Sequence, residues 1–236
     1  MDYAIIAAGK GSRMVSEGEQ LPKPLVKIGG VPMIRRIIDA FVSCGASKVH
    51  IIINEDMSEV EDYLKGLTLD VELNVVVKNT TGSMMSFYEL SNCLQSDCFC
   101  LSTVDSVFDA DEFKAYINEF TRNRDADGYM AVTSFIDDEI PLYVGVGNDG
   151  LITCFSDTLF PNAKVVSGGI YLLNREALNV LDACVKNGIT DMREYQRQLL
   201  VAGLALRAYQ FGKIVDVDHV QDIATANEFI KELDKE

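Results

Sequence analysis

A glycine-rich segment near the N-terminus has the composition of a phosphate-binding turn. It reads Ala7-Ala-Gly-Lys-Gly-Ser-Arg-Met14 and directly follows an apolar run that predicts a buried strand. Two glycines let the backbone pass close to an anion, whose oxygens the exposed N–H groups can bind. The dinucleotide fingerprint needs a third glycine that opens a helix, but Met14 stands there, no helical pattern follows, and a Walker A loop is absent. The segment therefore predicts a phosphate site of another kind or, alternatively, an ordinary tight turn.

Basic side chains gather beside this turn in a chain that is acidic overall. The protein has 21 Lys and Arg against 36 Asp and Glu, which gives a net charge of −15. Segment 10–27 nevertheless contains four basic residues and only two acidic ones. A cationic island of this kind suits a polyphosphate ligand. Proline stands on both sides of Lys23, so we expect Lys23 to lie in an extended segment.

Three aspartates stand where carboxylates could bind a divalent cation. Asp105 closes the apolar run 99–104, and a carboxylate at a strand end can be an oxygen ligand for Mg²⁺. Alternatively it caps a helix or a turn, a role for which Asp109 and Asp111 compete. Asp216 and Asp218 are two residues apart, so in a strand both face the same way. Adjacent like charges are destabilising unless a cation or water relieves them, which leaves a metal site and a solvated strand edge as alternatives.

The elements that must position these residues alternate between strands and helices. Apolar runs predict strands at residues 3–8, 49–53, 71–77, 99–104, 129–135, 164–173 and 204–217, the last broken at Gly212, with a hairpin at 143–155. Helical periodicity predicts helices at residues 32–45, 59–64, 83–94, 111–123, 176–186, 192–202 and 220–233. We therefore predict a single α/β domain over residues 1–236, Rossmann-like, with a mixed, mostly parallel sheet, helices on both faces and a late β-hairpin insertion. Ligands of such sheets bind at the carboxyl ends of the strands, where segments 8–14, 103–106 and 215–218 lie.

Composition argues against several other classes of function. The acidic net charge disfavours binding to nucleic acid or to an anionic membrane surface. The N-terminus has no basic leader and the chain has no apolar stretch near 18 residues, so we expect no signal peptide, no membrane span and a cytoplasmic location. Two histidines, and six cysteines without a C-x-x-C pair, argue against a zinc site. Cys98 and Cys100 are expected as buried thiols on one face of a strand.

Three segments together resemble the signature of the sugar-phosphate nucleotidylyltransferases. They are the loop Ala7-Ala-Gly-Lys-Gly-Ser-Arg-Met14, the segment Pro22-Lys-Pro-Leu25, and the segment Ile28-Gly-Gly-Val-Pro-Met33. That family has an A-A-G-x-G-x-R-[ML] loop, then P-K-P-L, then a G-x-P-[ML] segment that opens a helix. The resemblance continues through the alternation of strands and helices and covers nearly the whole chain. One departure is Val104, because family members often have a glycine before the aspartate at this place.

The resemblance implies a role for each candidate residue. Arg13 would stabilise charge on the departing β- and γ-phosphates, and Lys23 would stabilise charge at the α-phosphate. Mg²⁺ would bind Asp105 together with Asp216 or Asp218, the choice between these two being open, while Asp222 would open the terminal helix as a structural residue. The nucleotide would contact the loop and a later Gly-Ser segment, namely Ala7, Ala8, Gly9, Lys10, Gly11, Gly82 and Ser83. The acceptor would contact Gly168, Gly169 and Lys164, although the two glycines could instead form a bulge.

The activity implied is Mg²⁺-dependent transfer of a nucleotidyl group from a nucleoside triphosphate to a sugar 1-phosphate or a phosphocholine-like acceptor, with release of pyrophosphate. Alternatives are a molybdopterin or isoprenoid-precursor nucleotidylyltransferase and a non-catalytic nucleotide-sensing module. A nucleotide-sugar glycosyltransferase needs a D-x-D motif at a strand end, whereas Asp109-Ala-Asp111 lies where a helix begins. The sequence allows a homo-oligomer, and at 236 residues we expect no appended β-helix domain. The nucleotide base and the acceptor are not encoded in any recognisable motif.

Overall fold

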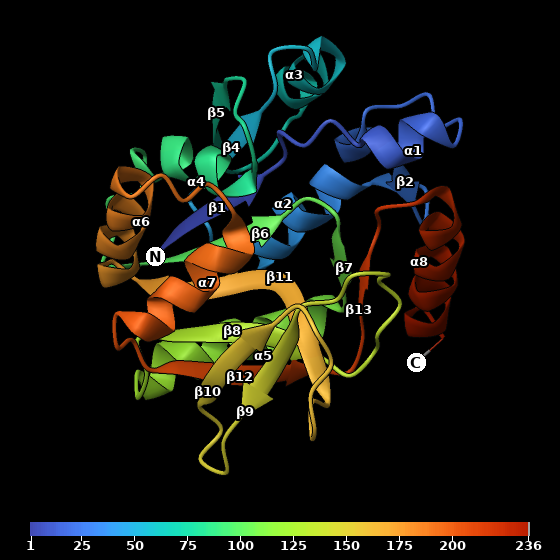
Figure 1. The fold of residues 1–236 in the computed structure, drawn as a ribbon. Coiled ribbons are helices and arrows are strands. Elements are labelled where there is room, and N and C mark those ends of the chain that lie inside the picture. Colours follow the sequence, from blue (N-terminus) through green and yellow to red (C-terminus); the bar gives the residue numbers. More distant parts are fainter. Residues whose placement is uncertain (236) are drawn as a thin grey trace.

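A central sheet of nine strands organises residues 1–235, the part of the chain that the computed structural model describes. Its strands are β1 (Asp2–Ile6), β4 (Lys48–Ile53), β5 (Glu72–Val77), β6 (Cys98–Thr103), β8 (Gly128–Thr133), β9 (Tyr143–Val146), β10 (Ile152–Ser156), β11 (Val165–Asn174) and β12 (Leu206–Phe211). Strands β6, β1, β4 and β5 are neighbours and run parallel, as do β8 and β12. Strand β11 joins the two parallel groups by pairing antiparallel with β6 and β8. The predicted α/β fold with a mixed, mostly parallel sheet is confirmed (Figure 1).

Helices cover both faces of this sheet, as predicted. Side chains alternate along β1, so Tyr3 and Ile5 pack on one face while Ala4 and Ile6 pack on the other. The helices α2 (Met33–Ser43), α3 (Ser58–Gly66) and α5 (Ala110–Asn123) bury their apolar sides against the first face. The helices α4 (Ser83–Ser91), α6 (Glu176–Lys186) and α7 (Met192–Val201) do the same on the second face. The expected thiols of Cys98 and Cys100 are buried together on the first face.

The late insertion is a β-hairpin at one edge of the sheet. Strands β9 and β10 pair antiparallel, and β9 also pairs with β11. The turn between them is closed by the N–H of Gly147, which donates to the carbonyl of Leu151 at 2.8 Å. Gly150 has a φ of 80°, a left-handed conformation that glycine adopts without strain. The hairpin predicted at residues 143–155 is therefore confirmed.

The segment after the glycine-rich turn differs from the prediction in two places. Residues Ser12–Ser16 form the short helix α1, where no helix was expected, because five residues are too few to show a helical period. Lys23, expected in an extended segment, lies in the 3₁₀ turn η1 (Lys23–Leu25). This turn accommodates Pro24 because the first N–H groups of a helical turn have no internal partner, and the N–H of Leu25 closes it on the carbonyl of Pro22 at 2.8 Å.

Two small sheets and the last helix close the molecule around this N-terminal segment. Strand β2 (Lys27–Ile28) pairs with β3 (Val31–Pro32), and β7 (Ser106–Phe108) pairs with β13 (Ile214–Asp216). Helix α8 (Val220–Leu233) packs on both small sheets through a separate apolar cluster that includes Met14, Ile28 and Phe229. Figure 1 shows the dark red helix α8 beside the blue segment that carries α1 and β2. The predicted break at Gly212 is confirmed, because it separates β12 from β13.

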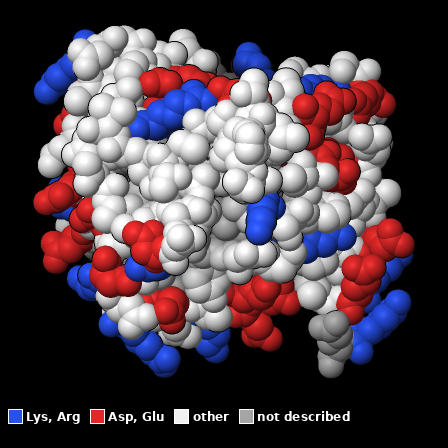
Figure 2. Space-filling view, turned by 60° about the horizontal axis from the view of Figure 1, so that its bottom comes forward, with Lys and Arg blue, Asp and Glu red and all other residues white. Residues whose placement is uncertain are grey.

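The surface reflects the composition. On the face shown in Figure 2, acidic side chains cover more area than basic ones, and groups of both signs are interspersed among uncharged residues. Within residues 1–235, none of the helices is both long enough and apolar enough to span a bilayer.

Candidate active site

The glycine-rich turn forms one wall of a cavity of about 530 Å³ at the carboxyl end of β1. Four of the predicted turn residues line it, namely Ala8, Gly9, Lys10 and Gly11. Ala7 is buried, and its N–H donates to the carbonyl of Ile52 at 2.9 Å. Gly11 has a φ of 59°, and a Cβ added there would lie 3.0 Å from the Cβ of Lys23. A glycine is therefore needed both for the backbone conformation and for the close approach of Lys23.

Three carboxylates meet beside this turn, and we call Asp105, Asp216 and Asp218 the acidic cluster. Asp105 lies two residues after the end of β6, while Asp216 ends β13 more than a hundred residues later. The pairing of β13 with β7 sets Asp216 opposite Ser106, and the N–H of Val217 donates to the carbonyl of Asp105 at 3.1 Å. One carboxylate oxygen from each aspartate lies within 4.8 Å of the other two. The fold thus brings together the two acidic segments that the sequence singled out.

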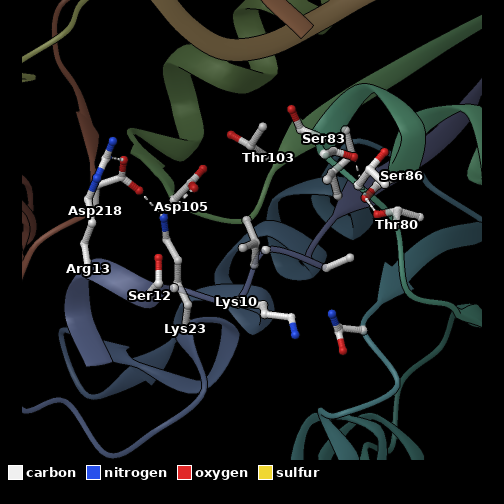
Figure 3. Close-up of a pocket in the computed structure, with 18 residues that line it drawn as sticks. Lys10, Ser12, Arg13, Lys23, Thr80, Ser83, Ser86, Thr103, Asp105 and Asp218 are labelled. Carbon is white, nitrogen blue, oxygen red and sulfur yellow. Dashed lines mark hydrogen bonds and ion pairs between the residues drawn. The ribbon is translucent and has the colours of Figure 1, made fainter. Parts of the chain in front are cut away.

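Two basic side chains reach into the acidic cluster. Lys23 is only 7% exposed, and its ammonium donates to Asp105 at 2.7 Å and to Asp218. Arg13 is half exposed and pairs with the other carboxylate oxygen of Asp218. Figure 3 shows these four side chains together at one end of the cavity, whereas Lys10 points away from them. The ammonium of Lys10 forms an ion pair with Asp56 at 3.4 Å. Arg13 and Lys23 therefore lie directly against the candidate metal ligands.

The pKa values show how the charges in this cluster interact. Burial lowers the pKa of Lys23, but the three carboxylates outweigh it, so the pKa is raised and the ammonium stays charged. Burial raises the pKa of Asp105, but the charge and hydrogen bond of Lys23 bring it below its ordinary value. The pKa of Asp216 is raised well above its ordinary value, because its carboxyl is desolvated and lies beside Asp105 and Asp218. The cluster therefore carries more negative charge than Lys23 balances.

This donor set fits a divalent cation. Mg²⁺ prefers oxygen ligands at about 2.1 Å in an octahedron, which puts neighbouring ligand oxygens about 3 Å apart and opposite ones about 4.2 Å apart. One carboxylate oxygen from each aspartate lies within 4.8 Å of the other two, which is close to these separations. An added cation would also relieve the repulsion that raises the pKa of Asp216.

Asp222 fixes the position of one cluster member. Its buried carboxylate accepts hydrogen bonds from the N–H of Asp218 at 3.0 Å and from the N–H of His219 at 2.6 Å, at the start of α8. These bonds satisfy N–H groups that the helix leaves free at its N-terminus. The structural role predicted for Asp222 is confirmed.

Hydroxyl side chains form the opposite end of the cavity. Gly82 precedes α4, and both it and Ser83 line the cavity. The hydroxyls of Thr80 and Ser86 are hydrogen-bonded at 2.6 Å, and Ser86 also donates to the carbonyl of Gly82 at 3.2 Å. Figure 3 shows Thr80, Ser83 and Ser86 at one end, and Asp105 and Asp218 of the acidic cluster at the other. The cavity therefore has one strongly charged end and one neutral polar end.

A smaller cavity of about 60 Å³ adjoins the first, and Thr103 lines both. Gly168, Gly169 and Asp216 line the smaller cavity. Gly169 has a φ of 75°, a Cβ there would lie 2.5 Å from the Oγ of Ser106, and the pairing of β11 with β8 is irregular at this place. The two glycines therefore form a bulge that also faces a cavity. Lys164 is exposed in the loop before β11 and lines neither cavity, so the structure does not bring it to the site.

Several polar residues of the first cavity were not singled out from the sequence, although two of them, Ser12 and Thr103, lie in segments predicted at the ligand-binding edge of the sheet. They are Ser12, Asn54, Thr80 and Thr103. Asn54 directly follows β4 and is buried, with its Oδ1 accepting from the N–H of Asp56 at 2.9 Å. Thr103 is the last residue of β6. The rule that ligands bind at the carboxyl ends of parallel strands points to both positions, and it was available from the predicted strands.

Comparison with known proteins identifies the family. Residues 3–189 match the MobA-like NTP transferase domain. The chain belongs to this family. It is 23% identical over 180 residues to a D-glycero-alpha-D-manno-heptose 1-phosphate guanylyltransferase of Campylobacter jejuni, covering 76% of this chain and 78% of that protein. It is 28% identical over 197 residues to the bifunctional protein GlmU of Thermodesulfovibrio yellowstonii, covering 79% of this chain and 41% of GlmU. The chain thus spans about half the length of its GlmU relatives.

A solved structure shares the fold of this MobA-like NTP transferase. The inositol-1-phosphate CTP transferase from T. maritima superposes with a TM-score of 0.81 at 16% identity, covering 98% of this chain and 96% of that one. The sequence resemblance to the sugar-phosphate nucleotidylyltransferases is confirmed by the family match, and the protein is a nucleotidyltransferase.

Proposed function

We propose that this MobA-like NTP transferase moves a nucleotidyl group from a nucleoside triphosphate to a phosphorylated small molecule, with Mg²⁺ as its cofactor. One observation carries the proposal: the acidic cluster lies against Arg13 and Lys23 at one end of a cavity that the glycine-rich turn walls. The two substrates are anions that repel one another, so a site that joins them needs positive charge where they meet. The similarity to a sugar 1-phosphate guanylyltransferase and the fold shared with an inositol-1-phosphate CTP transferase support a phosphorylated acceptor.

The attack itself needs no general base. The second pKa of a phosphate monoester is about 6, so the acceptor phosphate is already ionised at neutral pH. Its oxygen forms a bond to the α-phosphorus, the bond from that phosphorus to the β-phosphate oxygen breaks, and pyrophosphate leaves. Among residues 1–235, the lining of the first cavity contains no His or Cys that could act as a base or nucleophile. The rate must therefore come from positioning and from neutralising charge.

Asp105, Asp216 and Asp218 are the residues that would hold Mg²⁺. Bound there, the ion supplies a template for the phosphates of both substrates and stabilises charge as a Lewis acid. Lys23 orients the carboxylates of Asp105 and Asp218 and keeps them ionised. Arg13 uses one nitrogen for Asp218 and is half exposed, so its other N–H groups are free to bind the leaving pyrophosphate. The neutral, hydroxyl-lined end of the cavity is left for the ribose and the base.

The test is a matrix of nucleoside triphosphates against phosphorylated acceptors, with pyrophosphate measured by a coupled assay and the product by mass spectrometry. We expect pyrophosphate only when both substrates and Mg²⁺ are present, and no release in EDTA. Asp216→Asn should lower turnover strongly, whereas the matched control Asp182→Asn, on the exposed side of α6, should not. Nucleotide binding without pyrophosphate release from any pair would refute the proposal in favour of a nucleotide-sensing module.

We also infer that residues 1–236 act as one nucleotidyltransferase domain in a reducing, cytoplasmic compartment. The contribution of both Arg13 and Asp218 to one cavity supports a single functional unit. The thiols of Cys98 and Cys100 are buried among apolar side chains of the core, which supports a compartment where thiols stay reduced.

A further inference from the structure

Two side chains of the α1 region reach the segment that follows β13. Arg13 pairs with Asp218 of the acidic cluster. Glu17, at the end of α1, accepts a hydrogen bond from the backbone N–H of Val220 at 2.7 Å, and its second carboxylate oxygen pairs with Nδ1 of His219. Each of these contacts joins residues more than 200 positions apart in the chain. The C-terminal segment is therefore joined to α1 at two points.

These two points lie one helical turn apart. The backbone N–H of Glu17 donates to the carbonyl of Arg13 at 3.0 Å, so the positions of the two side chains are linked through the helix. Helix α1 has only five residues, and a helix this short is not stable without contacts to the rest of the fold. Its one buried side chain, Met14, packs in the apolar cluster that also contains side chains of α8. The position of Arg13 therefore depends on the contacts between α1 and the C-terminal segment.

Glu17 also caps helix α8. The first N–H groups of a helix lack partners within it, and the helix dipole favours a carboxylate at this end. Asp222 binds the N–H of Asp218 from within α8. Glu17 binds the N–H of Val220, the first residue of α8, from the other end of the chain. A cap from within the helix stabilises that helix, whereas this one also fixes α1, and with it Arg13, relative to the acidic cluster.

The contacts of Glu17 differ from those of Arg13 in what competes for them. Arg13 pairs with a candidate metal ligand, and its remaining N–H groups are proposed above to bind pyrophosphate, so two anions share one guanidinium. Glu17 does not line the first cavity, and its partners are a backbone N–H and a histidine outside the acidic cluster. Glu17 can therefore keep α1 in place while Arg13 binds a substrate.

We propose that Glu17 is a positioning residue of the transferase, which fastens α1 to α8 and thereby holds Arg13 where the pyrophosphate leaves. The proposal rests on the transferase function proposed above and adds a residue to it. Glu17 acts through Arg13, so its contribution should disappear when the guanidinium of Arg13 is absent. A purely structural cap would instead lower activity by the same factor whether or not Arg13 is present.

The first test is a double-mutant cycle on pyrophosphate release. Glu17→Ala should lower kcat/KM for the nucleoside triphosphate on the order of tenfold in the natural protein, and by less than about twofold in an Arg13→Ala background. Glu17→Gln keeps an oxygen that can accept from the N–H of Val220, so it should recover most of the loss. The matched control is Glu19→Ala, in the same segment, whose carboxylate accepts from two N–H groups of its own loop at 2.8 and 2.9 Å. This control should stay within about twofold of the natural protein.

A second variant breaks the same contact from the other side. Val220→Pro removes the N–H that Glu17 binds, and proline suits the first position of a helix after an extended residue such as His219. The helix should therefore stay intact even if Glu17→Ala fails to fold. We expect Val220→Pro to lower kcat/KM by less than Glu17→Ala, because the pair with His219 remains, and to change it little in an Arg13→Ala background.

Binding of inorganic pyrophosphate, measured by calorimetry with Mg²⁺ and without an acceptor, gives a readout that needs no turnover. Glu17→Ala should weaken this binding on the order of tenfold, with no further loss in an Arg13→Ala background. Equal factors with and without Arg13, or unchanged kcat/KM and binding in both Glu17→Ala and Val220→Pro, would refute the positioning role and leave the transferase function standing. If no pair of substrates releases pyrophosphate, the transferase function is refuted and the binding cycle alone decides the role of Glu17. Absence of both turnover and pyrophosphate binding in the natural protein would refute both.

Discussion

Replacing Lys23 by methionine tests whether the lysine holds the acidic cluster together. Its ammonium donates to both Asp105 and Asp218, whose side chains are 22% and 33% exposed. Removing one partner of a buried ion pair costs about 3–5 kcal/mol, and the partial exposure of these carboxylates lowers the expected loss to about 2–3 kcal/mol. For a chain of this size, that loss corresponds to a Tm about 4–12 °C lower. We therefore expect Lys23→Met to be markedly less stable than the natural protein in EDTA.

The same variant should respond more strongly to Mg²⁺. Without the ammonium, the three carboxylates repel one another and no lysine competes with the ion, so Mg²⁺ should raise the Tm of Lys23→Met more than that of the natural protein. The assay is calorimetric unfolding at neutral pH in EDTA and in 10 mM MgCl₂ (on the order of ten times a millimolar affinity). Lys10→Met is the matched control: its ion pair with Asp56 is 72% and 74% exposed, so the free energy of unfolding should change by less than about 0.5 kcal/mol. An unchanged Tm for Lys23→Met in EDTA, or equal Mg²⁺ shifts in both proteins, would refute the reasoning.

Further predictions concern the turn, the cluster and the C-terminal helix. Arg13→Ala and Asp105→Asn should each lower the rate of pyrophosphate release on the order of 100-fold or more while circular dichroism shows an intact fold; an Asp105→Asn enzyme with near-normal release would contradict its role. Gly11→Ala should lower the free energy of unfolding by about 1–2 kcal/mol in urea titrations, because its φ of 59° disfavours any side chain; an unchanged midpoint would contradict this. The pKa of His219 is raised because its Nδ1–H donates a hydrogen bond to the Glu17 carboxylate. While Glu17 is ionised, this pair stabilises the protein fully below the unfolded pKa of about 6.5, and the stabilisation is lost as the pH rises through the folded pKa of His219. Measured from pH 6 to 9, the Tm difference between the natural protein and Glu17→Gln should therefore shrink toward high pH, and a constant difference would contradict the assignment.

Local sequence patterns predicted the sheet, most helices and the turn, because these depend on residues close together in the chain. Tyr3 and Ile5 alternate with Ala4 and Ile6, so the burial of both faces of β1 followed from the sequence. The proximity of Asp105 to the C-terminal aspartates was inferred from the family resemblance. In the fold it depends on the pairing of two three-residue strands, β7 and β13, which are too short to leave a recognisable pattern.

The partners of the basic residues could not be predicted. Lys23 was expected to stabilise charge at the α-phosphate, and no sequence pattern indicated that a 3₁₀ turn would bury its side chain and direct the ammonium to Asp105 and Asp218. Helix α1 was missed because its start depends on the left-handed backbone of Gly11 and not on a periodic apolar face. Lys164 was assigned by resemblance alone, and the loop before β11 leaves it at the surface. Each of these differences comes from a contact between segments that are distant in the sequence, or from a backbone conformation that residue types do not specify.

The ion pair between Arg13 and Asp218 spans 205 positions of the chain, which has a consequence for biosynthesis. A chain still emerging from the ribosome exposes the N-terminal turn and its cations long before β13 and α8 have been translated. At that stage most of the large sheet can assemble. Lys23, however, lacks its partner Asp218, and the acidic cluster that would bind Mg²⁺ is incomplete. Nucleotidyl transfer by a nascent chain, or by a chain that proteolysis has cut before Asp216, would therefore have to proceed without the complete acidic cluster.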